Sequence, residues 1–187
     1  MNHLAIVAAA TAVMIGAGAG AVTRTPAPDP NAEIMNPMVA GEAMLPSRDL
    51  FDNAAHSPEH TVLVGDLQQT GVADVLKGKG PYTVFAPTND AFAAAGTLGD
   101  KAEVAKVLDY HIVRGMLDSK TLLRLIGEGG GQARLKTIEG DTLVAQMNGP
   151  TNIVLIDSKG QVADIAIYDV YEANGVMQVI DKVVRPS

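Results

Sequence analysis

The sequence predicts an α+β domain whose C-terminal half is a largely antiparallel sheet. Helical periodicity and capping residues prevail in the first part of the domain, whereas strand-like segments separated by turn residues follow from Ala133 onward. Of the 187 residues, 47% are hydrophobic but only 4% are aromatic. The core must therefore consist mainly of Val, Ile, Leu and Ala side chains, which favours a sheet covered by short helices.

The N-terminus has the pattern of an export signal. No charged residue occurs from Leu4 to Val22, and this apolar run ends in small-residue cleavage patterns at Ala17–Ala19 and Ala19–Ala21. We therefore predict a signal peptide at residues 1–21 and a secreted or periplasmic protein of the cell envelope. The alternative is membrane anchoring through an uncleaved N-terminal segment, since the run is nearly long enough to span a bilayer.

A proline-rich segment follows the signal. Residues 22–45 contain prolines without helical or strand periodicity, at positions 26, 28, 30 and 37. Such a composition predicts a flexible tether. The folded domain is then expected to cover residues 46–187.

The first part of the domain predicts a series of short helices. Ser57, followed by a proline and a glutamate, has the residue type of an N-cap, so a helix is expected from there to about Thr70. Another helix is expected from about Lys101, where apolar residues recur on one face. Asp118 or Ser119 is expected to cap the next helix.

The segment Tyr82–Phe92 combines a strand, a corner and the start of a helix. It opens with β-branched and aromatic residues in alternation and reaches a proline, at which the chain must leave the sheet. Thr88 or Asn89 can cap the helix that follows, and Asp90 complements the positive end of its dipole. We therefore interpret these three polar residues as a structural corner and not as a catalytic cluster.

Strands joined by turns make up the rest of the domain. The expected strands are Ala133–Ile138, Thr142–Met147, Ile153–Ile156, Val162–Val170 and Val176–Val184. The last two are connected by Asn174 and Gly175, a pair that favours a tight hairpin turn.

Charge and composition exclude several classes of function. The net charge is −7 and the 14 Lys and Arg residues are scattered singly, so we exclude nucleic acid as a partner. The absence of Cys removes disulfides, thiol catalysis and thiolate metal sites. His56 and His60 have a spacing that suits metal binding, but the proline between them is expected to leave His56 outside the helix. We expect no catalytic residues, no metal and no cofactor.

Tyr110 and His111 are the pair that we single out as a candidate site. His111 falls on the apolar face of its predicted helix, where a hydrogen-bonded core histidine is the plainer interpretation. Tyr110 lies about 100° further round the helix. Because Ile112 and Val113 follow, the alternative is an exposed tyrosine among aliphatic residues that serves as a recognition patch.

Three segments, in order, resemble the signatures of the fasciclin-like domain family. They are TVFAPTNDAF, then Tyr110-His111, then NGVMQVIDKVV near the C-terminus. The resemblance extends from about Met44 to Pro186, and AMLPSRDLFDNAAHSPEHTVL resembles the opening segment of bacterial members. It implies a β-sheet wedge with a layer of short helices in an exported, non-enzymatic protein.

The resemblance also implies a function and a site. The implied function is cell adhesion or extracellular binding, with a protein or a polysaccharide as partner. The implied contact residues are Tyr110, His111, Ile112 and Val113, whereas Thr88, Asn89, Asp90, Asn174 and Gly175 belong to structural motifs. Two positions differ from the family pattern, since Gln178 stands where members often have a second histidine and Arg114 where a proline commonly follows.

A carrier of an apolar ligand is the alternative function. Some members of the family resemble pigment carriers that bind carotenoids on apolar helical surface. The eight Met residues and the Ala-rich segment 91–95 are compatible with a bound carotenoid or lipid, although Met is more often adaptable core filling.

Overall fold

The computed structural model of the chain describes residues 36–187. Its helices are α1 (Leu50–His56), α2 (Thr61–Thr70), α3 (Ala73–Leu76), α4 (Asn89–Ala95), α5 (Lys101–Tyr110) and α6 (Ser119–Glu128). Its strands are β1 (Met38–Val39), β2 (Glu42–Ala43), β3 (Tyr82–Pro87), β4 (Ile112–Arg114), β5 (Gln132–Lys136), β6 (Thr142–Asn148), β7 (Asn152–Ile156), β8 (Val162–Glu172) and β9 (Gly175–Ile180). Strands β5 to β9 correspond to the strands predicted in the C-terminal half.

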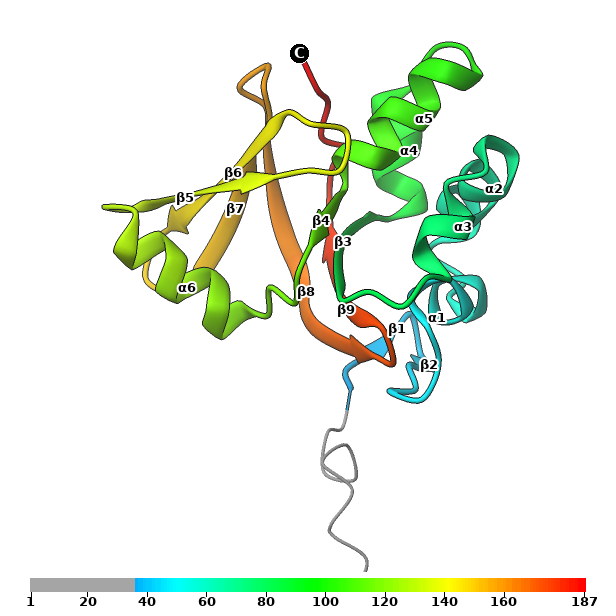
Figure 1. Cartoon of the computed structure of the whole chain (residues 1–187), viewed down its shortest axis with the longest axis horizontal. Helices are drawn as coiled ribbons and strands as arrows, with labels where there is room; N and C mark the ends of the chain where they lie inside the picture. The colour runs from blue at the N-terminus through cyan, green and yellow to red at the C-terminus, as the bar shows by residue number, and fades with distance from the viewer. Residues whose placement is uncertain (1–35) are drawn as a thin grey trace, which may run out of the picture. The chain divides into compact units, whose positions relative to one another are not determined.

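The main sheet has seven strands in the order β4-β3-β9-β8-β7-β6-β5 (Figure 1). Neighbouring strands are antiparallel except β3 and β9, which run parallel. The two edge strands meet at one point: Val113 of β4 bridges Thr137, just after β5, and the amide of Ile138 donates to the carbonyl of Ile112 at 2.9 Å. The predicted α+β class with a largely antiparallel sheet is confirmed.

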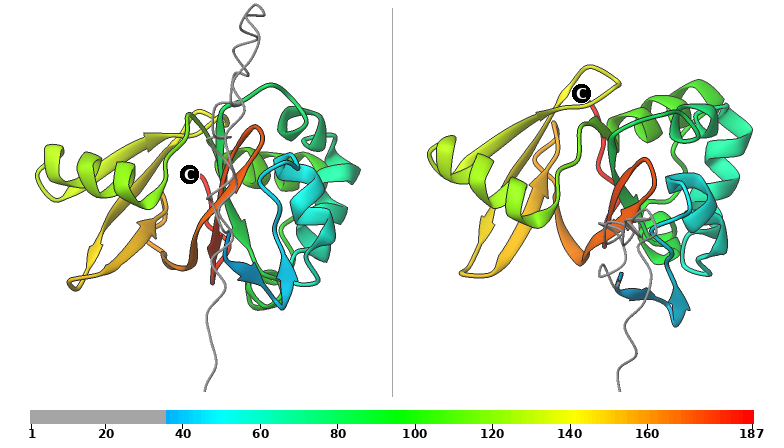
Figure 2. Two further views of the ribbon diagram at one scale, coloured as in Figure 1. Left: turned by 90° about the horizontal axis from the view of Figure 1, so that it is seen from below. Right: turned by 60° about the horizontal axis from the view of Figure 1, so that its bottom comes forward.

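The helices cover the sheet in two separate places (Figures 1 and 2). Helices α1 to α5 gather beside β3 and β9, and α6 lies against the strands at the other end of the sheet. Two buried apolar clusters correspond to these layers. Leu63 and Met177 belong to the cluster under α1 to α5, and Leu122 and Leu155 belong to the cluster under α6.

The corner after β3 has the predicted helix cap. The hydroxyl of Thr88 accepts a hydrogen bond from the amide of Ala91 at 3.2 Å, so Thr88 is the N-cap of α4. The side chain of Asn89 reaches a second helix, because its Oδ1 accepts from the amide of Val62 at 3.0 Å and its Nδ2 donates to the carbonyl of Pro58 at 2.9 Å. The corner therefore holds β3, α4 and the start of α2 together.

The turn between β8 and β9 is a second junction. Asn174 Oδ1 accepts from the amide of Leu50 at 3.0 Å, while its Nδ2 donates to the carbonyls of Leu76 at 2.6 Å and Gly78 at 2.8 Å. A Cβ atom added at Gly175 would clash with the carbonyl oxygen of Tyr82. The polar turn thus fastens α1 and α3 to the end of the sheet, and only glycine fits beside it.

The prediction that Ser57 begins a helix is wrong. The helix α1 was missed, and Ser57 is its C-cap; α1 begins after Asp49, which accepts from the amide of Asp52 at 2.8 Å. Helix α2 begins after His60, which makes no side-chain capping bond. In the first turn of α2, the free amide of Val62 is satisfied instead by Asn89, 27 residues away. A cap supplied from so far along the chain leaves no local signal.

The predicted end of the tether is also wrong. Residues 36–45 belong to the domain: β1 pairs with β2, and Val39 and Met44 are buried in the cluster under α1 to α5. The side chain of Asn36 binds both backbone groups of Tyr171, at 2.8 and 2.6 Å. The predicted signal peptide 1–21 and the remainder of the predicted tether lie outside the described residues. Among the helices within residues 36–187, none is long and apolar enough to cross a membrane.

Candidate functional site

The predicted contact residues lie in the interior of the domain. The exposed fractions are 0% for Tyr110, 1% for His111, 1% for Ile112 and 5% for Val113. The hydroxyl of Tyr110 donates to the carbonyl of Thr142 at 2.9 Å. The predicted exposure of Tyr110 is therefore wrong, and any influence of Tyr110, His111 and Ile112 on a partner must act through the fold.

The surroundings of His111 fix its protonation state. Its Nδ1 lies 2.7 Å from the carbonyl of Val107, so Nδ1 carries the proton, and its Nε2 accepts from the amide of Val184 at 3.2 Å. Burial lowers the pKa of His111 to about 4, so the ring is neutral at physiological pH. This is the hydrogen-bonded core histidine that we considered in the sequence.

A cavity opens beside the predicted segment, along the edge strand β5. It consists of two adjoining parts of about 470 and 540 Å³ that share Arg134 and Leu135. The first part lies between α6 and β5, and the second lies between β5 and β4, where Val113 contributes to the wall. We call the two parts together the β5 groove.

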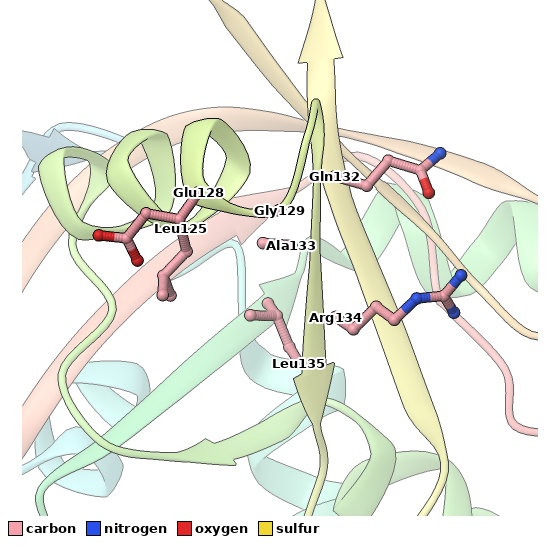
Figure 3. Close-up of a pocket in the computed structure, with 7 residues that line it drawn as sticks. All are labelled: Leu125, Glu128, Gly129, Gln132, Ala133, Arg134 and Leu135. Atoms are coloured by element: carbon pink, nitrogen blue, oxygen red, sulfur yellow. The ribbon is translucent and has the colours of Figure 1, made fainter.

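The side chains of β5 alternate between the groove and the opposite side of the strand. Ala133 and Leu135 are buried, whereas Gln132, Arg134 and Lys136 are exposed. Figure 3 shows Leu135 on the same side of β5 as Leu125 of α6, and shows Gln132 and Arg134 pointing the other way. The wall of the groove is therefore apolar, and its outer rim is polar.

The backbone of β5 lies open along this groove. Residues 132–136 pair with β6 on one side. On the other side, no backbone hydrogen bond within the described residues joins 133–136 to another element; contact with β4 begins only at Thr137 and Ile138. An edge strand with free amide and carbonyl groups can pair with an extended chain.

Helix α6, one wall of the groove, is held firmly at its N-terminal end. Asp118 caps it by accepting from the amide of Thr121 at 2.8 Å. Asp169 Oδ1 accepts from the amide of Ser119 at 2.7 Å and from Nε2 of Gln178 at 2.9 Å. Gln178 is thus a buried link between α6 and the sheet. The N-terminal end of this wall is therefore fixed to the sheet.

Three cations surround the groove. Arg114, Arg134 and Lys136 are exposed, and within the described residues none of them forms a salt bridge. Of the carboxylates near the groove, Glu128 pairs with Arg124 at 2.9 Å, whereas Glu139 accepts from the amide of Asp141 at 3.0 Å and forms no salt bridge within the described residues. Sequence reasoning missed this group because strand pairing, and not sequence proximity, brings Arg114 near β5. The alternating exposed cations of β5 were the available signal.

A second cavity, of about 470 Å³, lies between α2 and the α4–α5 region. Its apolar lining includes Val62, Phe92, Leu98 and Val104, and Asp66 and Asn89 are among its polar residues. No cluster of three or more metal-ligating side chains occurs within residues 36–187. His56 lies outside α2, as predicted, because it ends the preceding helix α1. His60 is the buried N-cap residue of α2, and its Nδ1 shares a 2.8 Å hydrogen bond with Ser57.

Comparison with known proteins shows the family. The model of the fasciclin domain matches residues 58–186. The chain belongs to this family. The domain is 33% identical over 132 residues to transforming growth factor-beta-induced protein ig-h3 of Sus scrofa, which is 67% of this chain and 17% of that protein. It is 31% identical over 147 residues to protein sll1483 of Synechocystis, 73% of each chain.

The fold also matches a solved structure of the family. A domain pair from the insect cell adhesion molecule fasciclin I superposes with a TM-score of 0.64 at 18% identity, covering 74% of this chain and 51% of that one. The fasciclin-like fold predicted from the sequence is thus confirmed. The chain spans about a fifth or less of the length of the ig-h3 relatives that it matches.

Proposed function

We propose that the domain is a non-enzymatic extracellular binding module that serves in adhesion and contacts its partner through the β5 groove. The family supports the class of function, since the resemblance implies adhesion or extracellular binding. The open backbone of β5 above an apolar wall is the observation that supports the place of contact. The predicted signal peptide agrees with a role outside the cytoplasm.

A protein partner suits the groove better than a polysaccharide. Polysaccharide sites usually present aromatic faces to the sugar rings, and the residues that line the β5 groove include none. The free backbone groups of an edge strand are matched by another polypeptide backbone. Protease treatment of the target surface should therefore abolish attachment, whereas loss of attachment after glycosidase treatment alone would indicate a polysaccharide.

Two leucines of α6 provide a matched test. Leu125 lines the groove, whereas Leu123 is 46% exposed on the same helix and does not line it. We expect Leu125→Glu to weaken attachment of the full chain to its native cell surface by about ten-fold or more, because it places a charge in the apolar wall. Leu123→Glu should leave attachment unchanged.

Folding of both variants is checked by circular dichroism and chemical denaturation. Leu117→Glu repeats the test from the part of the groove beside β4 if Leu125→Glu does not fold. Equal attachment of wild type and a folded groove variant would refute the site.

A carrier of an apolar ligand is the second candidate function. The cavity between α2 and the α4–α5 region has a size typical of small-molecule sites, and Phe92, Leu98 and Val104 line it. A carotenoid or lipid carried there should copurify with the protein from its native envelope. Visible absorbance and the mass of extracted lipid measure this, and a colourless, lipid-free preparation would eliminate the carrier function.

A further inference from the structure

We propose that the β5 groove binds an extended, acidic polypeptide segment, which adds to the sheet as a strand beside β5. This inference rests on the proposed function and specifies the chemistry of the partner. Its three grounds are the free backbone of β5, the alternation of its side chains and the cations around it, of which Arg134 and Lys136 have no ionic partner within the described residues and Arg114 lies over the ring of Tyr82.

The backbone of β5 defines the shape of the partner. Along residues 133–136, antiparallel pairing with β6 leaves the backbone groups of alternate residues facing the groove, and within the described residues no element pairs with them. The contact between Thr137 and Val113 closes the far end of this edge. An added strand therefore has about four residues of β5 to lie beside, which corresponds to a short extended segment.

The side chains of β5 define the pattern of the partner. In a paired strand, side chains directly opposite each other point to the same face. One face of the added strand would then meet Leu135 and Leu125, and the other would meet Arg134 and Lys136. A segment in which apolar and acidic residues alternate satisfies both faces.

The charges select a heterologous partner over a second copy of this chain. Arg114, Arg134 and Lys136 have no carboxylate partners within residues 36–187, although the chain carries a net charge of −7. Two copies joined through β5 would bring these like charges together, which is unfavourable. Cations on an edge strand also protect it from pairing with a second copy. Such protection would explain the cations, but it would not require a groove beside the strand. An acidic segment is stabilised by the same cations that exclude a second copy.

The probe is a fluorescent peptide of about seven residues in which glutamate and valine alternate. Its anisotropy is measured with the full chain at low and high salt. Two control peptides separate the contributions, one with lysine in place of glutamate and one with N-methyl groups that block backbone pairing. Of the three peptides, we expect only the acidic one to bind, with an affinity that falls as the salt concentration rises. We also expect the bound peptide to slow hydrogen exchange of the β5 amides.

A matched pair of double variants tests the cations. Arg134→Gln with Lys136→Gln should weaken peptide binding by about ten-fold or more. Lys101→Gln with Lys106→Gln removes the same charge from exposed positions of α5 and should have no effect. Equal loss in both variants would show general electrostatic attraction, and binding of the N-methylated peptide would show that no strand is added; either result overturns the inference.

The inference and the proposed function fail separately. If Leu125→Glu abolishes attachment but the acidic peptide neither binds nor competes, the groove is the contact site and its partner is not an acidic strand. If a folded Leu125→Glu variant attaches normally, the proposed contact site fails, whatever the peptide does.

Discussion

The segment Tyr110–Val113 and strand β5 lie on the two sides of the point where the sheet edges meet, yet they have opposite character. In the first, the side chains are buried and the polar atoms of Tyr110 and His111 are hydrogen-bonded. In the second, the backbone is open and the charges are unpaired within the described residues. The β-bridge between Val113 and Thr137 marks the boundary between these two segments. In this domain the apolar, aromatic segment lies in the interior, and the less conspicuous strand β5 provides the surface.

The largest expected difference between the two regions is in stability. Tyr110→Ala removes a fully buried ring from the cluster under α6 and should lower the free energy of unfolding by about 3–5 kcal/mol. Tyr110→Phe removes only the hydroxyl, with its hydrogen bonds to the carbonyl of Thr142 and to Oγ of Ser158, and should cost about 1 kcal/mol. Chemical denaturation measures both. A Tyr110→Ala variant as stable as wild type would mean that Tyr110 is not an interior residue.

Buried ionisable groups make the free energy of unfolding of the domain depend on pH. Burial raises the pKa of Glu172 to about 8, and its carboxyl oxygens have no hydrogen-bond partner within residues 36–187. Burial also lowers the pKa values of His60 and His111 to about 4. Hence the folded state holds a proton on Glu172 and excludes protons from the two histidines, relative to the unfolded chain.

The direction of the pH dependence follows from these shifts. Between pH 4.5 and 8 the unfolded chain has lost the Glu172 proton that the folded state keeps, so this group makes stability fall as pH rises. Between pH 6.5 and 4 the unfolded chain gains protons on His60 and His111 that the folded state refuses, so stability falls as pH drops. Because two histidines outweigh one glutamate, stability should be greatest near pH 6.5.

We therefore expect a net loss of about 1 kcal/mol on raising the pH from 6.5 to 8, because the two histidines, which still bind protons in the unfolded chain at pH 6.5, offset about half of the glutamate contribution. Chemical denaturation at the two pH values measures it. Glu172→Gln should remove this loss, whereas Arg134→Gln with Lys136→Gln in the open region should leave it unchanged. Equal stability of the wild type at pH 6.5 and 8 would contradict the buried, protonated state of Glu172.

The helix cap at the corner after β3 is expected to have a modest effect on the free energy of unfolding. Thr88→Ala removes the hydroxyl that accepts from the amide of Ala91 and should cost about 1 kcal/mol. Thr88→Ser keeps a hydroxyl and should restore most of this stability. Thermal or chemical denaturation distinguishes them, and equal stability of the alanine and serine variants would refute the cap.

Local signals explain which of these features could be predicted from the sequence. The caps at Thr88 and Asp118 act within three residues, so their residue types and positions are legible. The start of α2 depends on the side chain of Asn89, which follows Val62 by 27 residues. The burial of Tyr110 depends on β6, where its hydrogen-bond partner Thr142 lies 32 residues further along the chain. The cations of the groove are likewise assembled by the pairing of β4 and β5 with the rest of the sheet. A contact that is supplied by a distant segment leaves no local pattern in the sequence around the residue that it contacts.

The smallest effect on the free energy of unfolding is expected for the exposed cations of β5. Arg134 and Lys136 are exposed and take part in no salt bridge within the described residues, so changing both to Gln should alter the free energy of unfolding by less than about 0.5 kcal/mol. Chemical denaturation at the pH of maximum stability measures it, with the Lys101 and Lys106 double variant as control. A loss of more than about 1 kcal/mol would show that these cations support the fold. A neutral effect on stability together with weakened peptide binding would separate recognition from folding, because the residues that hold the domain together would then differ from those that meet the partner.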